Sequence, residues 1–243
     1  MNSSSAAIGP DTTVHFRDAD RTKDAEAIVK IYVNAFHEQE QFRWIFQTDG
    51  DAHRGALRLL FHGRLQLLRK YENTHLMIAH EGEEIIGACG IEPNSCVFSL
   101  YDRICAGLLI IALFYGYSCI TRLIKLGEEL AKDEAPDPRG GKLIMMAVDT
   151  KYQGQGIGSK LVEEILRKWD AESGGDLTLT TQLESNVKFY KYYGFETTNE
   201  TKWDGFTSWS MRRKKTDIAT ATATAATATA TAAGTLISTV LGK

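Results

Sequence analysis

Between an apolar strand and an amphipathic helix, the chain reads Val148-Asp149-Thr150-Lys151-Tyr152-Gln153-Gly154-Gln155-Gly156-Ile157-Gly158-Ser159-Lys160. The preceding run, 142–149, is almost continuously apolar, which is typical of a strand buried on both faces. Three glycines at every second position let the backbone approach a ligand closely and present free N–H groups to an anion at the start of a helix. The stretch therefore predicts a strand–turn–helix unit whose turn suits a pyrophosphate.

This glycine pattern differs from two known phosphate-binding loops. A P-loop starting at Gly154 would need a glycine before Lys160 and a hydroxyl residue after it, whereas the chain has Ser159 and Leu161. The dinucleotide fingerprint would place its third glycine where Ser159 stands. From spacing alone, a flexible loop that simply precedes a helix remains an equal alternative.

Strand-like and helix-like segments alternate on both sides of this unit. We expect strands at 13–16, 75–80, 84–91, 142–149, 177–182, 197–203 and 207–211, and helices at 24–36, 51–71, after the glycine turn, and at 186–193. This order predicts a mixed α/β or α+β domain with the strand–turn–helix–strand unit at its centre.

Composition excludes several classes of protein. The chain has 243 residues, 43% of them hydrophobic and 24% charged, and its net charge of −3 offers no basic field for nucleic acid. The four cysteines form no Cys-x-x-Cys pair and the six histidines are scattered, so we expect neither a metal site nor a disulfide framework. The N-terminus lacks a secretory signal, so we expect an intracellular, cytoplasmic protein with reduced cysteines.

We expect three parts in the chain: a disordered N-terminus at 1–10, one domain at 11–215 with a helical insert at about 96–138, and a disordered Ala/Thr-rich tail at 216–243. Residues 104–121 are uncharged and could suggest a membrane span. One crossing would separate the strands on either side, which then could not pair. We therefore favour a buried helix, or a substrate-side helix that leans on a membrane.

Two motifs resemble the GNAT superfamily of N-acetyltransferases. Gln153-x-x-Gly156-x-Gly158 after an Ala-Val-Asp strand end is similar to that family's acetyl-CoA pyrophosphate loop, and the stretch 186–195 resembles its Asn…Phe-Tyr…Gly-Phe signature. The resemblance covers roughly 13–213. It implies the GNAT fold, in which a central mixed, mostly antiparallel sheet is splayed at the middle and flanked by helices.

The resemblance also implies an activity and a site. The chain would be an acyltransferase that moves an acetyl group from acetyl-CoA, its co-substrate, to a primary amine of a small molecule, or of a protein or peptide, by direct attack in a ternary complex. Tyr190 would protonate the departing thiolate, although a core aromatic is the alternative role for this residue. The co-substrate would contact Met146, Ala147, Val148, Gln153, Gly154, Gln155, Gly156, Ile157, Gly158, Ser159 and Asn186.

The general base and the acceptor are less defined. The central strand carries no carboxylate between Leu143 and Val148, which leaves Glu92 and Asp102 as candidates, each also readable as a solvated surface group. The acceptor pocket would be built by the first two helices and the insert, with Phe42, Trp44, Phe46 and 108–117 as apolar candidates.

We expect no metal and no nucleic-acid partner, and a homodimer stays open. Two rival hypotheses remain: a catalytically silent acyl-CoA-binding module, and a single-span membrane protein using 104–121.

Overall fold

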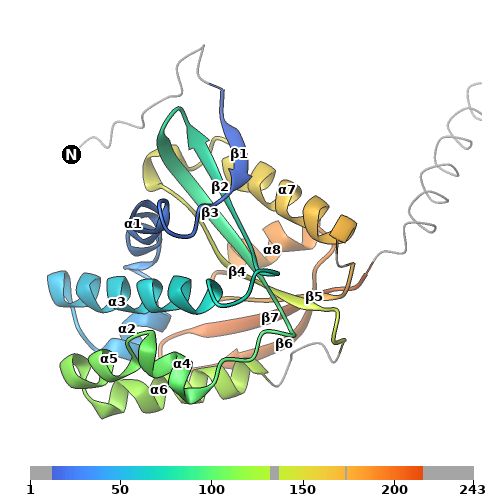
Figure 1. The fold of residues 1–243 in the computed structure, drawn as a ribbon. Coiled ribbons are helices and arrows are strands. Elements are labelled where there is room, and N and C mark those ends of the chain that lie inside the picture. The colour runs from blue at the N-terminus through green and yellow to red at the C-terminus, as the bar shows by residue number, and fades with distance from the viewer. Residues whose placement is uncertain (1–12, 132–136, 173, 216–243) are drawn as a thin grey trace, which may run out of the picture.

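The computed structural model describes residues 13–131, 137–172 and 174–215. Within these residues, seven strands form one sheet in the order β1-β2-β3-β4-β5-β7-β6, with helices on both faces (Figure 1). The strands are β1 His15–Asp18, β2 His75–Glu81, β3 Glu84–Pro93, β4 Gly141–Val148, β5 Leu177–Thr181, β6 Glu196–Lys202 and β7 Thr207–Arg213. The helices are α1 Ala25–Phe36, α2 Glu40–Phe46, α3 Gly50–Leu68, α4 Leu100–Cys105, α5 Leu108–Tyr115, α6 Tyr117–Ala131, α7 Ile157–Glu172 and α8 Glu184–Tyr192. A single 3-10 turn, Thr150–Tyr152, follows β4.

The core has two clusters, one on each face of the sheet. Helices α1 and α3 bury Ile28, Tyr32 and Leu57 on one face. Helix α7 buries Leu161 and Trp169 on the other, against β2, β3 and β4. The apolar residues of these helices recur at the spacing that gives each helix a single core-facing stripe. The two clusters confirm the expected helices that flank the sheet.

The sheet is splayed at its middle. Strands β4 and β5 are parallel but pair only at Gly141 with Leu177 and at Lys142 with Thr178. Farther along, β4 contains a bulge, because the register with β3 shifts between Ala88 and Gly90 and Met145 adopts a left-handed φ of 51°. All other pairings in the sheet of the described residues are antiparallel. The expected mixed, mostly antiparallel and splayed sheet is confirmed.

The apolar run 104–121 is not one helix. Gly107 and Gly116, with φ values of 97° and 80°, interrupt it and leave α5 between them. The expectation of a buried helix is wrong here, because Ile111 is the one residue of α5 that is buried. In the part of the chain that the structure describes, no helix is long and apolar enough to cross a membrane.

Other expectations differ in detail. The first strand begins at His15, two residues later than predicted, and α2 is an additional helix that the apolar spacing did not predict. The ends expected to be disordered, 1–10 and 216–243, lie outside the described residues.

Candidate active site

The glycine turn is held by side chains of the segment that precedes it. The Asp149 carboxylate accepts a hydrogen bond from the Lys151 N–H at 3.0 Å, and the Tyr152 hydroxyl donates to Glu84 at 3.1 Å. The Gln153 side-chain amide donates to the Val148 carbonyl at 3.0 Å. These contacts fix the chain direction between β4 and α7.

Open space surrounds the glycines of the turn. Gly154 and Gly156 have φ values of 78° and 77°, and a Cβ atom built on either would have no neighbour within 4 Å. Gly158 differs, since its Cβ would lie 2.8 Å from the Met146 side chain, so this glycine lets α7 pack closely on β4. The first two glycines thus leave room for a ligand, while the third brings the helix and strand together.

The start of α7 presents backbone amides without an intrahelical acceptor beside that space. Lys160 is the first residue of the helix whose N–H closes an intrahelical bond, to Gly156 at 3.1 Å. The N–H groups of Ile157, Gly158 and Ser159 belong to the first turn, where helical amides have no intrahelical acceptor. Together with the positive end of the helix dipole, they suit an anion. Gln155 lies in the same turn and has a partner within the structure.

The backbone polar groups of Val148 point away from β3, toward the side of β4 that has separated from β5. Hydrogen-bonded and non-bonded residue pairs alternate along an antiparallel ladder. The Asp149 N–H donates to Ile86 at 2.8 Å, so Ala147 is the next residue to bond with β3, and Val148, opposite Gly87, is not. The N–H of Val148 therefore faces the edge of β4 that has separated from β5.

Helix α8 places the two residues predicted from the second motif. The Asn186 side-chain amide donates to the Thr181 hydroxyl at 3.2 Å, which ties the first turn of α8 to the end of β5. One turn later, Tyr190 is 7% exposed, and its ring packs edge-on against Phe189 and Phe195, with centroids 5.1 and 5.9 Å away. Burial, with a smaller effect of the Cys89 thiol, raises the pKa of Tyr190 well above its usual value. At neutral pH this phenol keeps its proton.

The sequence did not single out two buried residues, Cys89 at the bulge and Tyr32 on α1. Cys89 on β3 occupies the shifted register opposite Met145 and is fully buried, and burial raises the pKa of its thiol. Burial raises the pKa of Tyr32 on α1, and the Cys89 thiol raises it further by a smaller amount. Among the described residues, the buried Tyr32 hydroxyl has no hydrogen-bond partner. No local pattern indicates this arrangement, because Tyr32 occupies an ordinary core position of an amphipathic helix.

The two candidate bases are engaged elsewhere. Glu92 forms an ion pair with Arg64, and it lies opposite Lys142, at the end of β4 that is remote from the glycine turn. Asp102 caps α4 and accepts from Lys70 at 2.7 Å; the lysine and the capping Ser99 lower the pKa of Asp102 to about 2.

Of the three aromatic residues expected at the acceptor side, Trp44 is half-buried. Phe42 and Phe46 are core residues. Trp44 packs edge-on against Trp203 and Phe206 of the β6–β7 hairpin, with centroids 5.2 and 6.0 Å away. The buried indole N–H of Trp203 has no partner among the described residues. The contact joins α2 to the half of the sheet beyond the splay.

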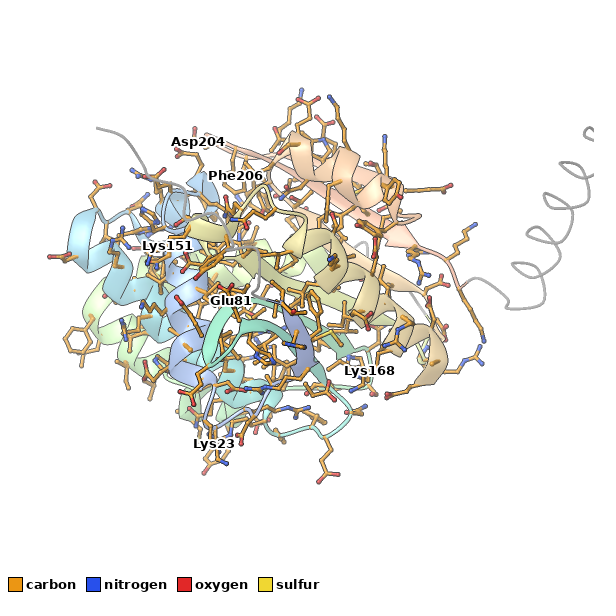
Figure 2. The ribbon with its side chains drawn as sticks, turned by 90° about the horizontal axis from the view of Figure 1, so that it is seen from above. Lys23, Glu81, Lys151, Lys168, Asp204 and Phe206 are labelled. Carbon is orange, nitrogen blue, oxygen red and sulfur yellow. The ribbon has the colours of Figure 1, made fainter. Side chains whose placement is uncertain are left out.

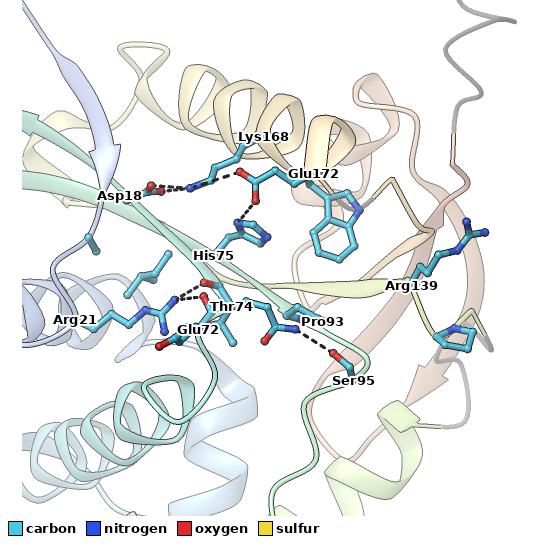
Figure 3. A pocket seen from close by; sticks show the side chains of 15 residues that line it. Asp18, Arg21, Glu72, Thr74, His75, Pro93, Ser95, Arg139, Lys168 and Glu172 are labelled. Carbon is cyan, nitrogen blue, oxygen red and sulfur yellow. Dashed lines mark hydrogen bonds and ion pairs between the residues drawn. The ribbon is translucent and has the colours of Figure 1, made fainter.

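A cavity among the described residues lies elsewhere. It has a volume of about 590 Å³ and is lined by charged and polar side chains that include His75, Arg139 and Glu172 (Figure 3). Within it, Lys168 binds both carboxylate oxygens of Asp18 at 2.7 and 2.6 Å. Figure 2 shows Lys168 well apart from Lys151, which precedes the glycine turn, so this cavity is at the other end of α7.

No group of three His, Cys, Asp or Glu side chains among the residues described could hold a metal ion.

Comparison with known proteins agrees with this geometry. Residues 132–215, which include the glycine turn and α8, match the family model described as the acetyltransferase (GNAT) domain. A comparison with curated protein sequences gives no match.

Several solved structures share the fold. The crystal structure described as histone acetyltransferase HPA2 and related acetyltransferase, from Corynebacterium glutamicum, is 19% identical and superposes with a TM-score of 0.62 over 85% of this chain and 97% of its own. A GNAT-family structure from Desulfovibrio desulfuricans is 15% identical, with a TM-score of 0.51 over 84% and 100% of the two chains. Protein PH1933 from Pyrococcus horikoshii, also 15% identical, has a TM-score of 0.52 over 84% and 100%. Residues 132–215 thus resemble a GNAT acetyltransferase domain, and the chain shares the fold of these solved structures.

Proposed function

We propose that the chain is an acetyl-CoA-dependent N-acetyltransferase that acts on a primary amine of a small molecule or peptide, by direct attack in a ternary complex. One observation carries the proposal. The splay of β4 from β5 opens beside three features: the glycine turn, the outward-facing Val148 amide and α8 with Tyr190. An anion site, a hydrogen-bond donor and a proton donor would thus border the same gap.

The glycine turn fits the pyrophosphate of acetyl-CoA. The space over Gly154 and Gly156 is open, and the unpaired amides of the first turn of α7 are next to it. The thioester arm would then follow the free edge of β4 along Met146 and Val148. A strand edge with unpaired amides and carbonyls can bind the amide groups of such an arm as an additional strand would.

The chain's own groups would act at two points of the reaction. When the amine attacks the acetyl carbonyl, the Val148 N–H is placed to donate to the oxygen on which negative charge develops. Tyr190 would donate its proton to the sulfur of the departing thiolate, and the proton that the attacking nitrogen releases as the amide forms would return to the phenolate. Its raised pKa keeps the phenol protonated over the whole neutral range, so the donor form is present at each turnover. Because the raised pKa also makes the phenol a weaker acid, the proton would pass from Tyr190 to the sulfur only once the thiolate charge has formed fully.

Neither candidate carboxylate suits the role of the base. Glu92 and Asp102 both bind cations, and the low pKa of Asp102 makes it a weak proton acceptor. We propose instead that the amine loses its proton to water before it attacks. Because alkyl amines have pKa values near 10, kcat/KM should then rise with pH up to about 9 or beyond.

The experiment is an amine panel assayed by release of free coenzyme A. Amine-dependent thiol release, equal in amount to the acetylated amine found by mass spectrometry, supports the proposal. Binding of acetyl-CoA without turnover on any amine would instead identify a silent acyl-CoA-binding module. Failure to bind acetyl-CoA would contradict both functions.

A further inference from the structure

The cavity at the C-terminal end of α7 takes no part in the proposed reaction. Its volume of about 590 Å³ is within the usual range of small-molecule sites, roughly 300–1,000 Å³. Residues of β1, β2, β3 and α7 line it, together with the segment that leads into β4 (Figure 3). Helix α7 has 16 residues, so about 24 Å of helix separates the cavity from the glycine turn. A ligand bound here would not occupy the gap between β4 and β5.

The cavity contains a buried histidine that has no hydrogen bond. The His75 side chain is 8% exposed, and Trp169 meets its ring edge-on at a centroid distance of 5.7 Å. Its Nδ1 atom is 3.9 Å from a Glu172 carboxylate oxygen, which is too long for a hydrogen bond. Among the described residues, neither ring nitrogen has a hydrogen-bond partner. A buried polar group without a partner is unfavourable, so this imidazole is free to contact a ligand.

One side of His75 favours a cation. Glu172 lies above the imidazole in Figure 3, and its carboxylate makes no hydrogen bond among the described residues. Lys168 is 4.0 Å from this carboxylate, but its ammonium is engaged by Asp18, whose two carboxylate oxygens it bonds at 2.7 and 2.6 Å. Glu172 is also the last residue of α7, where the backbone carbonyls of a helix attract positive charge.

The other side of His75 favours an anion. The half-buried Arg21 guanidinium donates to four backbone carbonyls, those of Leu68, Tyr71, Glu72 and Thr74. These bonds hold the guanidinium in place without neutralising its charge, and no carboxylate in the described part of the chain forms an ion pair with it. Burial lowers the pKa of Arg21. Because buried charges are normally paired, a negative group beside Arg21 would be stabilised.

We propose that this cavity binds a zwitterionic amino acid, whose ammonium group contacts Glu172 and His75 and whose carboxylate faces Arg21. Burial lowers the pKa of His75, so the ring is neutral at neutral pH. A neutral imidazole has one donor and one acceptor nitrogen and can therefore bond either charged group. The side chain of the amino acid would lie against the apolar part of the lining, which consists of Leu76, Pro93 and Pro138.

Ligands that carry a single charge fit the cavity less well. An anion would leave the Glu172 carboxylate without a counter-ion and would be repelled by it. A cation would in turn face the unneutralised charge of Arg21. A ligand with both charges complements the two sides of His75 at once.

The test is calorimetric titration of the full chain with the standard amino acids and with γ-aminobutyrate, whose two charges lie farther apart. We expect at least one of them to bind. Its analogues without the ammonium group or without the carboxylate should bind at least about tenfold more weakly, because each lacks a charge-assisted contact. Glu172→Gln should weaken binding by about the same factor. Glu163→Gln is the matched control, since this exposed glutamate of α7 lies outside the lining and its loss should leave binding unchanged.

Three outcomes would contradict the proposal. The first is that none of these amino acids binds. The second is an analogue with one charge that binds as tightly as the amino acid. The third is equal binding by Glu172→Gln and wild type, which would place the ligand elsewhere, for example at the acceptor side as a substrate. Because Glu172 is exposed, the melting temperature of its variant should be nearly unchanged, which separates lost binding from misfolding. The titration contains no acetyl-CoA, so its result does not depend on the proposed acetyl transfer.

Discussion

Replacing Tyr190 by phenylalanine separates a proton donor from a core aromatic. The change removes one hydroxyl and keeps the ring, which is 7% exposed and packs on Phe189 and Phe195. Stability should therefore fall by no more than about 1 kcal/mol, the typical net value of a hydrogen bond. General-acid catalysis contributes about 10²–10⁴-fold, or roughly 3–5 kcal/mol of activation free energy. Tyr190→Phe should thus lower the rate of acetyl transfer by that factor, with acetyl-CoA affinity unchanged.

Single-turnover kinetics is the appropriate assay, because product release can conceal a slower chemical step in kcat. Tyr71→Phe is the matched control: it removes a hydroxyl that donates to the Val97 carbonyl at 2.5 Å, far along the chain from the proposed site. That variant should lose stability of the same order without losing rate. If Tyr190→Phe transfers acetyl within about twofold of wild type, well short of the general-acid range, another group protonates the thiolate and the assignment fails.

Three other predictions concern the glycine turn, the packing of α4 on α3, and the ion pair between Asp102 and Lys70. Gly156→Glu should abolish acetyl-CoA binding measured by calorimetry, whereas Gly156→Ala should retain most of it, although both variants carry the same left-handed backbone cost of about 1–2 kcal/mol. Equal binding by both variants would mean that the turn does not hold the pyrophosphate. Gly63→Ala should destabilise the fold by about 1–3 kcal/mol in denaturant unfolding, because its Cβ would overlap the Ala106 carbonyl. The control Gly127→Ala, whose Cβ would meet open space, should be neutral or stabilising, and a neutral Gly63→Ala would contradict the packing of α4 on α3. The Lys70 ammonium is the main group that lowers the pKa of Asp102 to about 2, so the ionised carboxylate stabilises the fold above about pH 4 and this stability is lost as pH falls toward 2. The melting temperatures of wild type and Asp102→Asn should therefore differ at pH 7 and converge in that acid range.

Local patterns predicted the centre of the fold. The change from a continuous apolar strand to a glycine turn and then to helical spacing occurs within thirty residues, and β4 and α7 follow it closely. The β2–β3 hairpin was also predictable, because Gly82 adopts the positive φ of 57° that its short turn requires. In both places the backbone conformation is determined by neighbouring residues, which a sequence displays directly.

Features that depend on distant contacts were not predictable. Helix α2 has seven residues and is stabilised by burying Phe42, Ile45 and Phe46 against other elements, which no local spacing indicates. The left-handed Met145 sits in an ordinary apolar run, and its conformation follows from pairing with β3. A buried helix was one of the two expectations for 104–121, yet the helix breaks at its glycines leave half of α5 exposed.

A crystal structure of the chain with acetyl-CoA tests the central claim most directly. We predict the pyrophosphate on the amides of the turn and first helical residues, 154–159, the thioester arm along Met146 and Val148, and the Tyr190 hydroxyl within hydrogen-bond reach of the sulfur. Acetyl-CoA bound elsewhere, for example in the cavity lined by His75 and Arg139, with the gap between β4 and β5 empty, would contradict the proposed site.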